Sequence, residues 1–258
     1  MLISSPVTPN HNARRIISLV PSITELIAYF DLDDETLAIT KFCVHPEKWY
    51  RSKLRIGGTK DFNIEKIMAL RPDLVLSNKE ENSKDPVEKL AETIPVYLSD
   101  VNNVEDALVM IRDIGLLTGK LSEADSLIEN ITMAFRNIPP GNDPLRTAYL
   151  IWKDPYMTVG GDTFISDMMK KAGFDNVFAD AGRYPIVSLP ELVASAPELL
   201  LLSSEPFPFK EKHVVEFQSL FPYTRVLIAD GEMFSWYGSR MALAPAYFTD
   251  LYLRVQST

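Results

Sequence analysis

The residues with the clearest potential for metal chemistry stand in the stretch CVHP, where Cys43 and His45 are two positions apart. A C-x-H pair can supply metal ligands, and a neutral imidazole can bind cobalt or iron axially. The chain holds one cysteine and three histidines, too few for a thiolate-rich zinc site or a cage of several histidines. We therefore predict no resident metal. His45 is a candidate for contacting a metal-containing ligand, and Cys43 is expected to be a small buried residue.

A second candidate is the junction RIISLVPSITELI, in which an apolar, β-branched run meets Pro21 and becomes helical. Ser22 and Glu25 fit the S-x-x-E pattern of a capping box, with Pro21 just outside the helix. A stable helix start explains this pattern without any ligand. The free N–H groups and the positive end of the helix dipole could also receive a carboxamide, carboxylate or phosphate. Pro21 and Ser22 are therefore candidate binding residues.

Aromatic residues at predicted strand ends offer flat apolar faces to a planar macrocycle. Trp236 and Tyr237 lie in the stretch GEMFSWYGSR, which is polar, punctuated by glycine and placed after a predicted strand. These features favour a ligand wall, although a single aromatic residue is often part of the core. The aromatic candidates are Phe42, Trp49, Tyr50, Trp152, Tyr156, Trp236 and Tyr237.

No set of catalytic residues is recognisable. The chain lacks the G-x-S-x-G, Walker, G-x-G-x-x-G and H-E-x-x-H motifs. The stretch VGGDTF is a glycine turn into a helix, with Asp162 or Thr163 as the N-cap, and it offers no evident nucleophile or base. We therefore predict a protein that is not an enzyme.

Strand-like and helix-like patterns alternate along the chain, which predicts an α/β fold with parallel sheets covered on both faces. A helical period of apolar residues runs from Leu121 to Ile138, roughly 27 Å of helix, and Pro139-Pro140-Gly141 ends it. We predict an N-terminal lobe (1–117), a linking helix (118–140) and a C-terminal lobe (141–258). The expected strands are 16–20, 37–40, 74–77, 96–98, 147–152, 199–203 and 226–229, and the expected helices are 22–30, 64–71, 86–93, 104–117, 162–172, 190–196 and 210–218.

An internal repeat supports this division. The segment NIEKIMALRPDLVLSN (63–78) aligns without gaps to SLPELVASAPELLLLS (188–203), and each predicts a helix, a proline stop and a buried strand. Any helix–proline–strand unit of an α/β protein has some of this pattern. The shared order of features favours duplication or two lobes of the same architecture.

Composition limits the possible partners. The formal net charge of −9 argues against nucleic acid and anionic membranes as partners. One cysteine excludes an internal disulfide, and no run of residues approaches the roughly 18 apolar positions of a membrane span. The first residues of the supplied sequence do not have the pattern of a secretory signal. We expect either a cytoplasmic protein or one whose signal lies outside this sequence.

Taken together, RIISLVPSITELI, ITKFCVHP, GGTKDFNIEKIMALRPDLVL and IGLLTGK resemble the helical-backbone substrate-binding proteins of ABC importers. The resemblance covers nearly the whole chain and is nearest to the cobalamin-binding branch. It implies two Rossmann-like lobes joined by one long helix, with the ligand in a cleft between the lobes. It also implies a corrinoid, haem or ferric siderophore as ligand, no intrinsic cofactor, an extracytoplasmic location, a possible ABC permease partner, and a monomer.

The resemblance assigns roles to particular residues. Arg240 matches an arginine that contacts the ligand in the cobalamin-binding branch, and Trp236 replaces an acidic residue of some members, which favours stacking there. Tryptophans that line the ligand cleft in an enterobacterial member fall near Thr59 and Asn78. The segment NKEEN (78–82) is instead expected to form a polar loop, with Asn78 and Lys79 near the ligand. The ligand is then smaller or more polar than cobalamin.

The resemblance also suggests docking residues for a permease. One surface glutamate in each lobe pairs with permease arginines in importer-linked members. Glu65 matches the position in the first lobe, whereas the second lobe has Pro190 there and Glu191 one residue later. A shift of one residue turns a helical side chain by ~100°, which weakens the second contact.

The leading hypothesis is a binding protein for a corrinoid or related metal chelate. One alternative is a cytoplasmic chelatase-like enzyme that uses His45 and neighbouring acids. Another is a cytoplasmic sensor or carrier on the same two-lobed fold.

Overall fold

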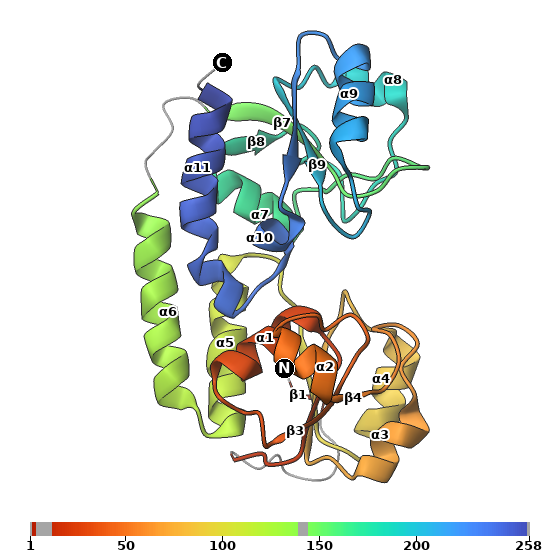
Figure 1. Cartoon of the computed structure of the whole chain (residues 1–258), viewed down its shortest axis with the longest axis vertical. Helices are drawn as coiled ribbons and strands as arrows, with labels where there is room; N and C mark the ends of the chain where they lie inside the picture. Colours follow the sequence, from red (N-terminus) through yellow and green to blue (C-terminus); the bar gives the residue numbers. More distant parts are fainter. Residues whose placement is uncertain (1, 4–11, 139–143, 257–258) are drawn as a thin grey trace. The chain divides into compact units, whose positions relative to one another are not determined.

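The computed structural model describes residues 2–3, 12–138 and 144–256. Contacts divide the chain into two units, each with its own β-sheet (Figure 1). Unit 1 comprises residues 1–101, 105–131 and 236–240, and unit 2 comprises residues 102–104, 132–235 and 241–258. The segment 236–240 thus belongs with unit 1 although it follows the last strand of unit 2. The lobe boundaries expected from the sequence stay a prediction.

The sheet of unit 1 has the strand order β1-β6-β5-β2-β3-β4. All neighbouring strands are parallel except β1, which pairs antiparallel with β6. The central strands β2 and β5 are buried along their whole length, as expected for a parallel sheet covered on both faces. The strands are β1 (Leu2–Ile3), β2 (Ile16–Ser18), β3 (Thr36–Ile39), β4 (Leu54–Arg55), β5 (Leu74–Asn78) and β6 (Val96–Ser99), and the helices are α1 (Pro21–Tyr29), α2 (Glu47–Ser52), α3 (Ile64–Leu70) and α4 (Lys84–Ala91).

The sheet of unit 2 has the order β10-β9-β7-β8 and is parallel throughout. Its core packs side chains of β7 and β9 against α8 and α9, including Leu150, Leu192, Leu202 and Phe217. The strands are β7 (Leu145–Leu150), β8 (Phe174–Asn176), β9 (Leu199–Ser203) and β10 (Arg225–Ala229), and the helices are α7 (Phe164–Lys171), α8 (Leu189–Ala194), α9 (Glu211–Leu220), α10 (Gly231–Ser235) and α11 (Ala244–Gln256), with a 3₁₀ turn, η1 (Ser239–Ala242).

The two sheets share the order of four parallel strands. In unit 1 the order β6-β5-β2-β3 places the first strand beside the third and the second, and β10-β9-β7-β8 does the same in unit 2. The predicted α/β fold with two parallel sheets is confirmed. The short strands β1, β4 and β8 were not expected, because two or three residues are too few to show a period.

The internal repeat is confirmed in the helices that carry it. Asn63 caps α3 by accepting a hydrogen bond from the Lys66 N–H at 2.8 Å, and Ser188 caps α8 by accepting one from the Glu191 N–H. After these helices, Arg71 and Ala196 occupy aligned positions and both have left-handed backbone angles, with φ of 47° and 45°.

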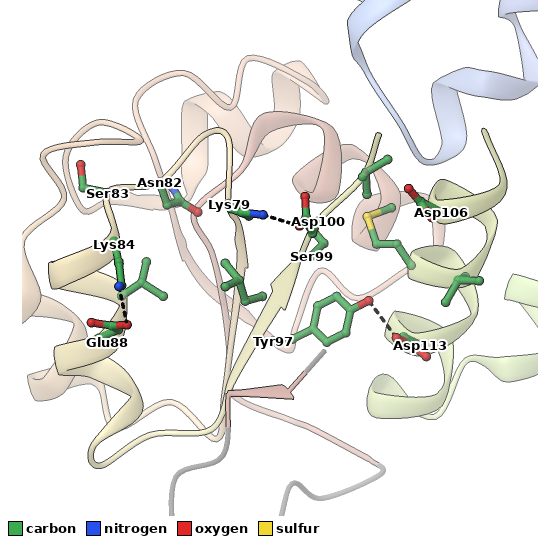
Figure 2. A pocket seen from close by; sticks show the side chains of 15 residues that line it. Lys79, Asn82, Ser83, Lys84, Glu88, Tyr97, Ser99, Asp100, Asp106 and Asp113 are labelled. Carbon is green, nitrogen blue, oxygen red and sulfur yellow. Dashed lines mark hydrogen bonds and ion pairs between the residues drawn. The ribbon is translucent and has the colours of Figure 1, made fainter. Parts of the chain in front are cut away.

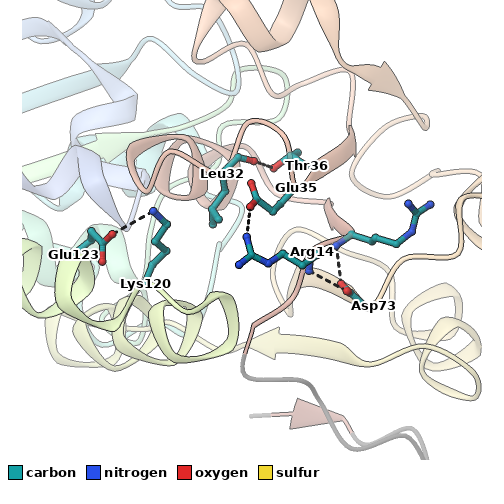
Figure 3. Close-up of polar contacts among 8 residues, drawn as sticks. Arg14, Leu32, Glu35, Thr36, Asp73, Lys120 and Glu123 are labelled. Atoms are coloured by element: carbon teal, nitrogen blue, oxygen red, sulfur yellow. Dashed lines mark hydrogen bonds and ion pairs between the residues drawn. The ribbon is translucent and has the colours of Figure 1, made fainter.

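A hydrogen-bonded corner follows each of these repeated helices. In unit 1 the Asp73 carboxylate accepts hydrogen bonds from the backbone N–H groups of Arg14 and Arg15, each at 2.9 Å (Figure 3). In unit 2 the Glu198 carboxylate accepts one from the Arg146 N–H at 3.0 Å. The Arg15 and Arg146 side chains donate in turn to carbonyls at the ends of α3 and α8. Equivalent hydrogen bonds thus anchor the chain at the start of β2 in unit 1 and of β7 in unit 2.

Two helices follow the first sheet. Helix α5 (Val104–Thr118) is joined through Gly119 and Lys120 to α6 (Leu121–Arg136), and the two lie side by side in Figure 1. A Cβ atom at Gly115 would lie 2.4 Å from the Ala124 Cβ, so glycine permits this close packing. Helix α6 begins in unit 1 and ends in unit 2.

The predicted long helix is confirmed as α6, but it ends at Arg136 and not at Ile138. The Asn137 N–H is shared between the carbonyls of Met133 and Ala134, which tightens the last turn. The predicted stop at Pro139-Pro140-Gly141 lies outside the described residues. The chain also passes between the units at 101–105 and 235–241, so α6 is not the sole connection. Among the residues that the structure describes, no helix is both long and apolar enough to cross a membrane.

Candidate functional site

Parallel α/β sheets bind ligands at the carboxyl ends of their strands. In unit 1 this edge is formed by the residues that follow β2, β3, β5 and β6, together with the loop after β4. We call this set of loops the carboxyl edge of unit 1. Most of the predicted binding residues of unit 1 lie on it or on the adjoining helix α1.

Helix α1 begins differently from the prediction. Pro21 is the first helical residue and Val20 is the N-cap, with extended backbone angles and no side-chain cap. Ser22 is inside the helix and 5 % exposed. The predicted capping box between Ser22 and Glu25 is therefore wrong. Proline is favoured at the first helical position because an N–H group there would have no acceptor within the helix. The Glu25 carboxylate forms its hydrogen bonds with another residue.

The partner of Glu25 is Arg240, far along the sequence. The guanidinium donates through Nε at 3.0 Å and Nη2 at 2.5 Å to the two Glu25 oxygens. The two side chains are 11 % and 22 % exposed, so this bidentate ion pair is largely shielded from water. Gly238 allows the approach: its φ is 108°, and an added Cβ would lie 3.3 Å from the Leu26 Cβ on α1.

Two predicted ligand residues join this ion pair. The Trp236 ring lies under the Arg240 guanidinium at 4.9 Å and meets the His45 ring edge-on, with centroids 5.5 Å apart. Trp236 and Tyr237 are only 7 % and 6 % exposed. The structure thus brings His45, Trp236 and Arg240 together around Glu25, although stacking of Trp236 on a ligand stays a prediction.

Another predicted aromatic residue of unit 1, Phe42, is exposed at this edge. Phe42 follows β3 and leaves 51 % of its surface accessible, with the Lys41 ammonium 5.1 Å from its ring centre. Nearby, Cys43 is buried, as predicted, and makes 3.1 Å contacts with the Thr24 and Thr40 hydroxyls. Burial raises the pKa of its thiol. Phe42 therefore offers a flat apolar surface to solvent at this edge.

Asn78 was expected in a loop and is instead the last residue of β5. It is fully buried, and its amide donates to the carbonyl and hydroxyl oxygens of Ser99. Its side-chain oxygen accepts hydrogen bonds from the N–H groups of Glu80 and Glu81. Asn78 thus shapes the turn from within, whereas Lys79 is exposed and pairs with Asp100 at 2.6 Å. A contact of either residue with a ligand stays a prediction.

Lys79 also borders a cavity of about 580 Å³ in unit 1, formed by β6, α4 and α5. Figure 2 shows Lys79 reaching toward Asp100 and the Tyr97 hydroxyl donating to Asp113. The volume suits a small molecule. The cavity extends from the carboxyl edge along β6, and apart from Lys79 its lining was not among the predicted residues.

Trp152 and Tyr156, the predicted aromatic residues of unit 2, follow β7. That strand ends at Leu150, two residues earlier than expected. Trp152 is 39 % exposed and packs edge-on against Phe207, whereas Tyr156 packs against Phe217 and the core of unit 2. Trp152 therefore offers more surface to a ligand than Tyr156.

Further along unit 2, Thr163 is the N-cap of α7, accepting from the Ser166 N–H. It was one of the two residues predicted for that role.

The two predicted docking residues occupy different local settings. Glu65 is exposed in the first turn of α3. Glu191, in the first turn of α8, forms a complete capping box with Ser188, whose N–H and hydroxyl donate to its carboxylate at 2.7 and 2.6 Å. These bonds lower the pKa of Glu191. Glu191 thus has a structural role that Glu65 lacks.

The long-range ion pairs at this site were not predicted from the sequence. Glu25 was interpreted as a capping residue, and its pairing with a residue 215 positions away leaves no local signal. Asp100 was likewise not singled out. Within the described residues, no group of three or more histidine, cysteine, aspartate or glutamate side chains is placed to hold a metal ion.

Two α/β units whose sheets share the order of four parallel strands, with the long helix α6 beginning in one unit and ending in the other, form a two-lobed α/β fold. Residues 16–218 match the family described as periplasmic binding protein, and the chain belongs to that family.

Similar proteins carry related names. A vitamin B12-binding protein of Yersinia pestis (strain Pestoides F) is 27% identical over 208 residues, covering 79% of this chain and 74% of that protein. The structure of the periplasmic vitamin B12-binding protein BtuF of Vibrio cholerae has a TM-score of 0.76 at 20% identity, covering 95% of this chain and 99% of the other. The periplasmic heme-binding protein BhuT, solved with two hemes, has a TM-score of 0.78 at 19% identity, covering 93% and 97%.

Proposed function

We propose that this protein binds a corrinoid or a related metal chelate outside the cytoplasm and delivers it to an ABC importer. The observation that carries the proposal is the match to vitamin B12-binding proteins over 79% of the chain, within the periplasmic binding protein family. The protein holds the ligand and performs no chemical step on it.

The residues at the strand ends support a chelate with a broad apolar face. Phe42 in unit 1 and Trp152 in unit 2 are aromatic, exposed and placed directly after parallel strands. Large aromatic surfaces favour stacking on a flat macrocycle. Trp236, Arg240 and His45 form the second group that we assign to ligand recognition, because they gather within unit 1 around one ion pair.

A thermal-unfolding panel tests this function. Cyanocobalamin, haemin and a ferric siderophore are each added to the purified protein, with free ligand far above the dissociation constant. At a hundredfold excess over Kd, binding stabilises the folded state by about 2.7 kcal/mol. For a protein of this size that raises the melting temperature by roughly 5–10 °C. The corrinoid is expected to give such a shift, and a flat response to all three compounds would refute the proposal.

A further inference from the structure

We infer that unit 1 selects an uncharged metal chelate with amide side chains, of the corrinoid type, against chelates that present carboxylates, such as haem. This inference rests on the proposed function and narrows its ligand class. It comes from the way the cations of unit 1 are paired with acids.

Arg240 is the most shielded of these cations. Both Glu25 oxygens accept from its guanidinium, and the two side chains are 11 % and 22 % exposed. Because water screens a partly buried pair only weakly, the carboxylate offsets the guanidinium charge locally. A ligand carboxylate that approaches Arg240 also approaches Glu25, and like charges at close range repel.

The second cation, Lys79, is also paired with an acid, but both side chains of this pair are exposed. Its ammonium lies 2.6 Å from the Asp100 carboxylate, at the ends of the neighbouring strands β5 and β6. Lys60, on the loop after β4, donates to the backbone carbonyl of Glu80 at 3.0 Å. Each of these cations is therefore held against an acid or on an acid-rich turn.

Acidic residues also accompany Lys41, the remaining cation that we consider at the carboxyl edge. Lys41 is weakly paired with Asp61 at 3.8 Å. Glu80 and Glu81 stand on the turn that follows β5 at the same edge. A ligand bound here meets carboxylates at least as often as cations.

This arrangement discriminates between two chemical classes. A ligand carboxylate loses its hydration beside cations that are already paired with acids. The desolvation free energy is then larger than the remaining attraction to those cations. An amide side chain carries no charge and donates N–H groups to carboxylate oxygens such as those of Glu25 and Asp100. Specificity is then set as much by repulsion of the wrong ligand as by attraction of the right one.

The test uses Glu25→Gln, which keeps the side-chain shape and removes the negative charge beside Arg240. Dissociation constants for cyanocobalamin and haemin are measured by fluorescence quenching on the full chain. The wild type is expected to bind cyanocobalamin at least tenfold more tightly than haemin. In Glu25→Gln, affinity for haemin is expected to rise by about tenfold and affinity for cyanocobalamin to change by less than about threefold.

A matched control is Glu47→Gln, which makes the same change in net charge at an exposed pair with Arg51 on α2. It is expected to leave both affinities unchanged. If Glu25→Gln fails to fold, Asp100→Asn applies the same change beside Lys79 and is expected to favour haemin in the same direction. Haemin binding by the wild type as tight as that of cyanocobalamin, or a gain no larger than in Glu47→Gln, overturns the inference alone. Failure of both chelates to bind overturns the proposed function together with the inference.

Discussion

Replacement of Asp73 by alanine tests the repeated hydrogen-bonded corner that anchors β2 in unit 1 and β7 in unit 2. The Asp73 carboxylate accepts two backbone N–H groups at 2.9 Å, whereas Glu198 accepts one at 3.0 Å in the matching place (Figure 3). A hydrogen bond to a charged group contributes roughly 1.5–3 kcal/mol when water is excluded. Both corners lie near the surface, so we take about 1 kcal/mol for each bond, below that range. Asp73→Ala is then expected to cost about 2 kcal/mol and Glu198→Ala about 1 kcal/mol.

The chain provides separate probes for the two units, since its three tryptophans are Trp49, Trp152 and Trp236. In a Trp152→Phe background, fluorescence reports on unit 1. In a Trp49→Phe, Trp236→Phe background it reports on unit 2. Urea unfolding in the first background should place the midpoint of Asp73→Ala roughly 1 M below its reference.

The conservative variant Asp73→Asn keeps one acceptor oxygen and is expected to lose about half as much stability. The claim that stability follows the number of hydrogen bonds at each corner is refuted by either of two results. One is a loss of unfolding free energy in Asp73→Ala no larger than in Glu198→Ala, and the other is a loss of less than about 0.5 kcal/mol.

Two further predictions concern unit 2 and docking. Burial, then Lys212 and Lys153, lowers the pKa of His213, whose Nδ1 accepts from the Lys210 N–H at 2.9 Å. The stability that the neutral ring provides is complete above its unfolded value of about 6.5 and is lost as the pH falls toward the folded value. His213→Gln should therefore flatten the decline in urea midpoint below about pH 6.5, and an unchanged decline would contradict this assignment. We also expect Glu65→Ala to reduce stimulation of the importer's ATPase in proteoliposomes. Glu191→Ala should chiefly lower the stability of unit 2, and the reverse pattern would count against the docking role of Glu65.

Much of the fold was predictable because buried parallel strands and capped helices leave local patterns. The segments 63–78 and 188–203 were each predicted to form a helix, a proline stop and a buried strand, and the structure has the helix and the strand in both. Short strands such as β4 and β8 were not predicted, because their pairing depends on strands distant in the sequence.

The site was less predictable for the same physical reason. The S-x-x-E pattern of Ser22 and Glu25 suits a capping box locally, but the ion pair with Arg240 and the proline at the first helical position determine the actual geometry. Asn78 has the residue type of a loop, yet its backbone pairs with Ser99 of β6 and extends β5 through it. Such long-range contacts decide which polar residues face a ligand, and a single sequence does not display them.

Equilibrium dialysis of the full chain against cyanocobalamin tests the central claim most directly. The corrinoid absorbs visible light, so the amount retained with the protein is read from absorbance on the two sides of the membrane. We predict saturable retention that approaches one corrinoid for each chain. Equal absorbance on both sides at every concentration would contradict the claim that this protein is a corrinoid-binding member of its family.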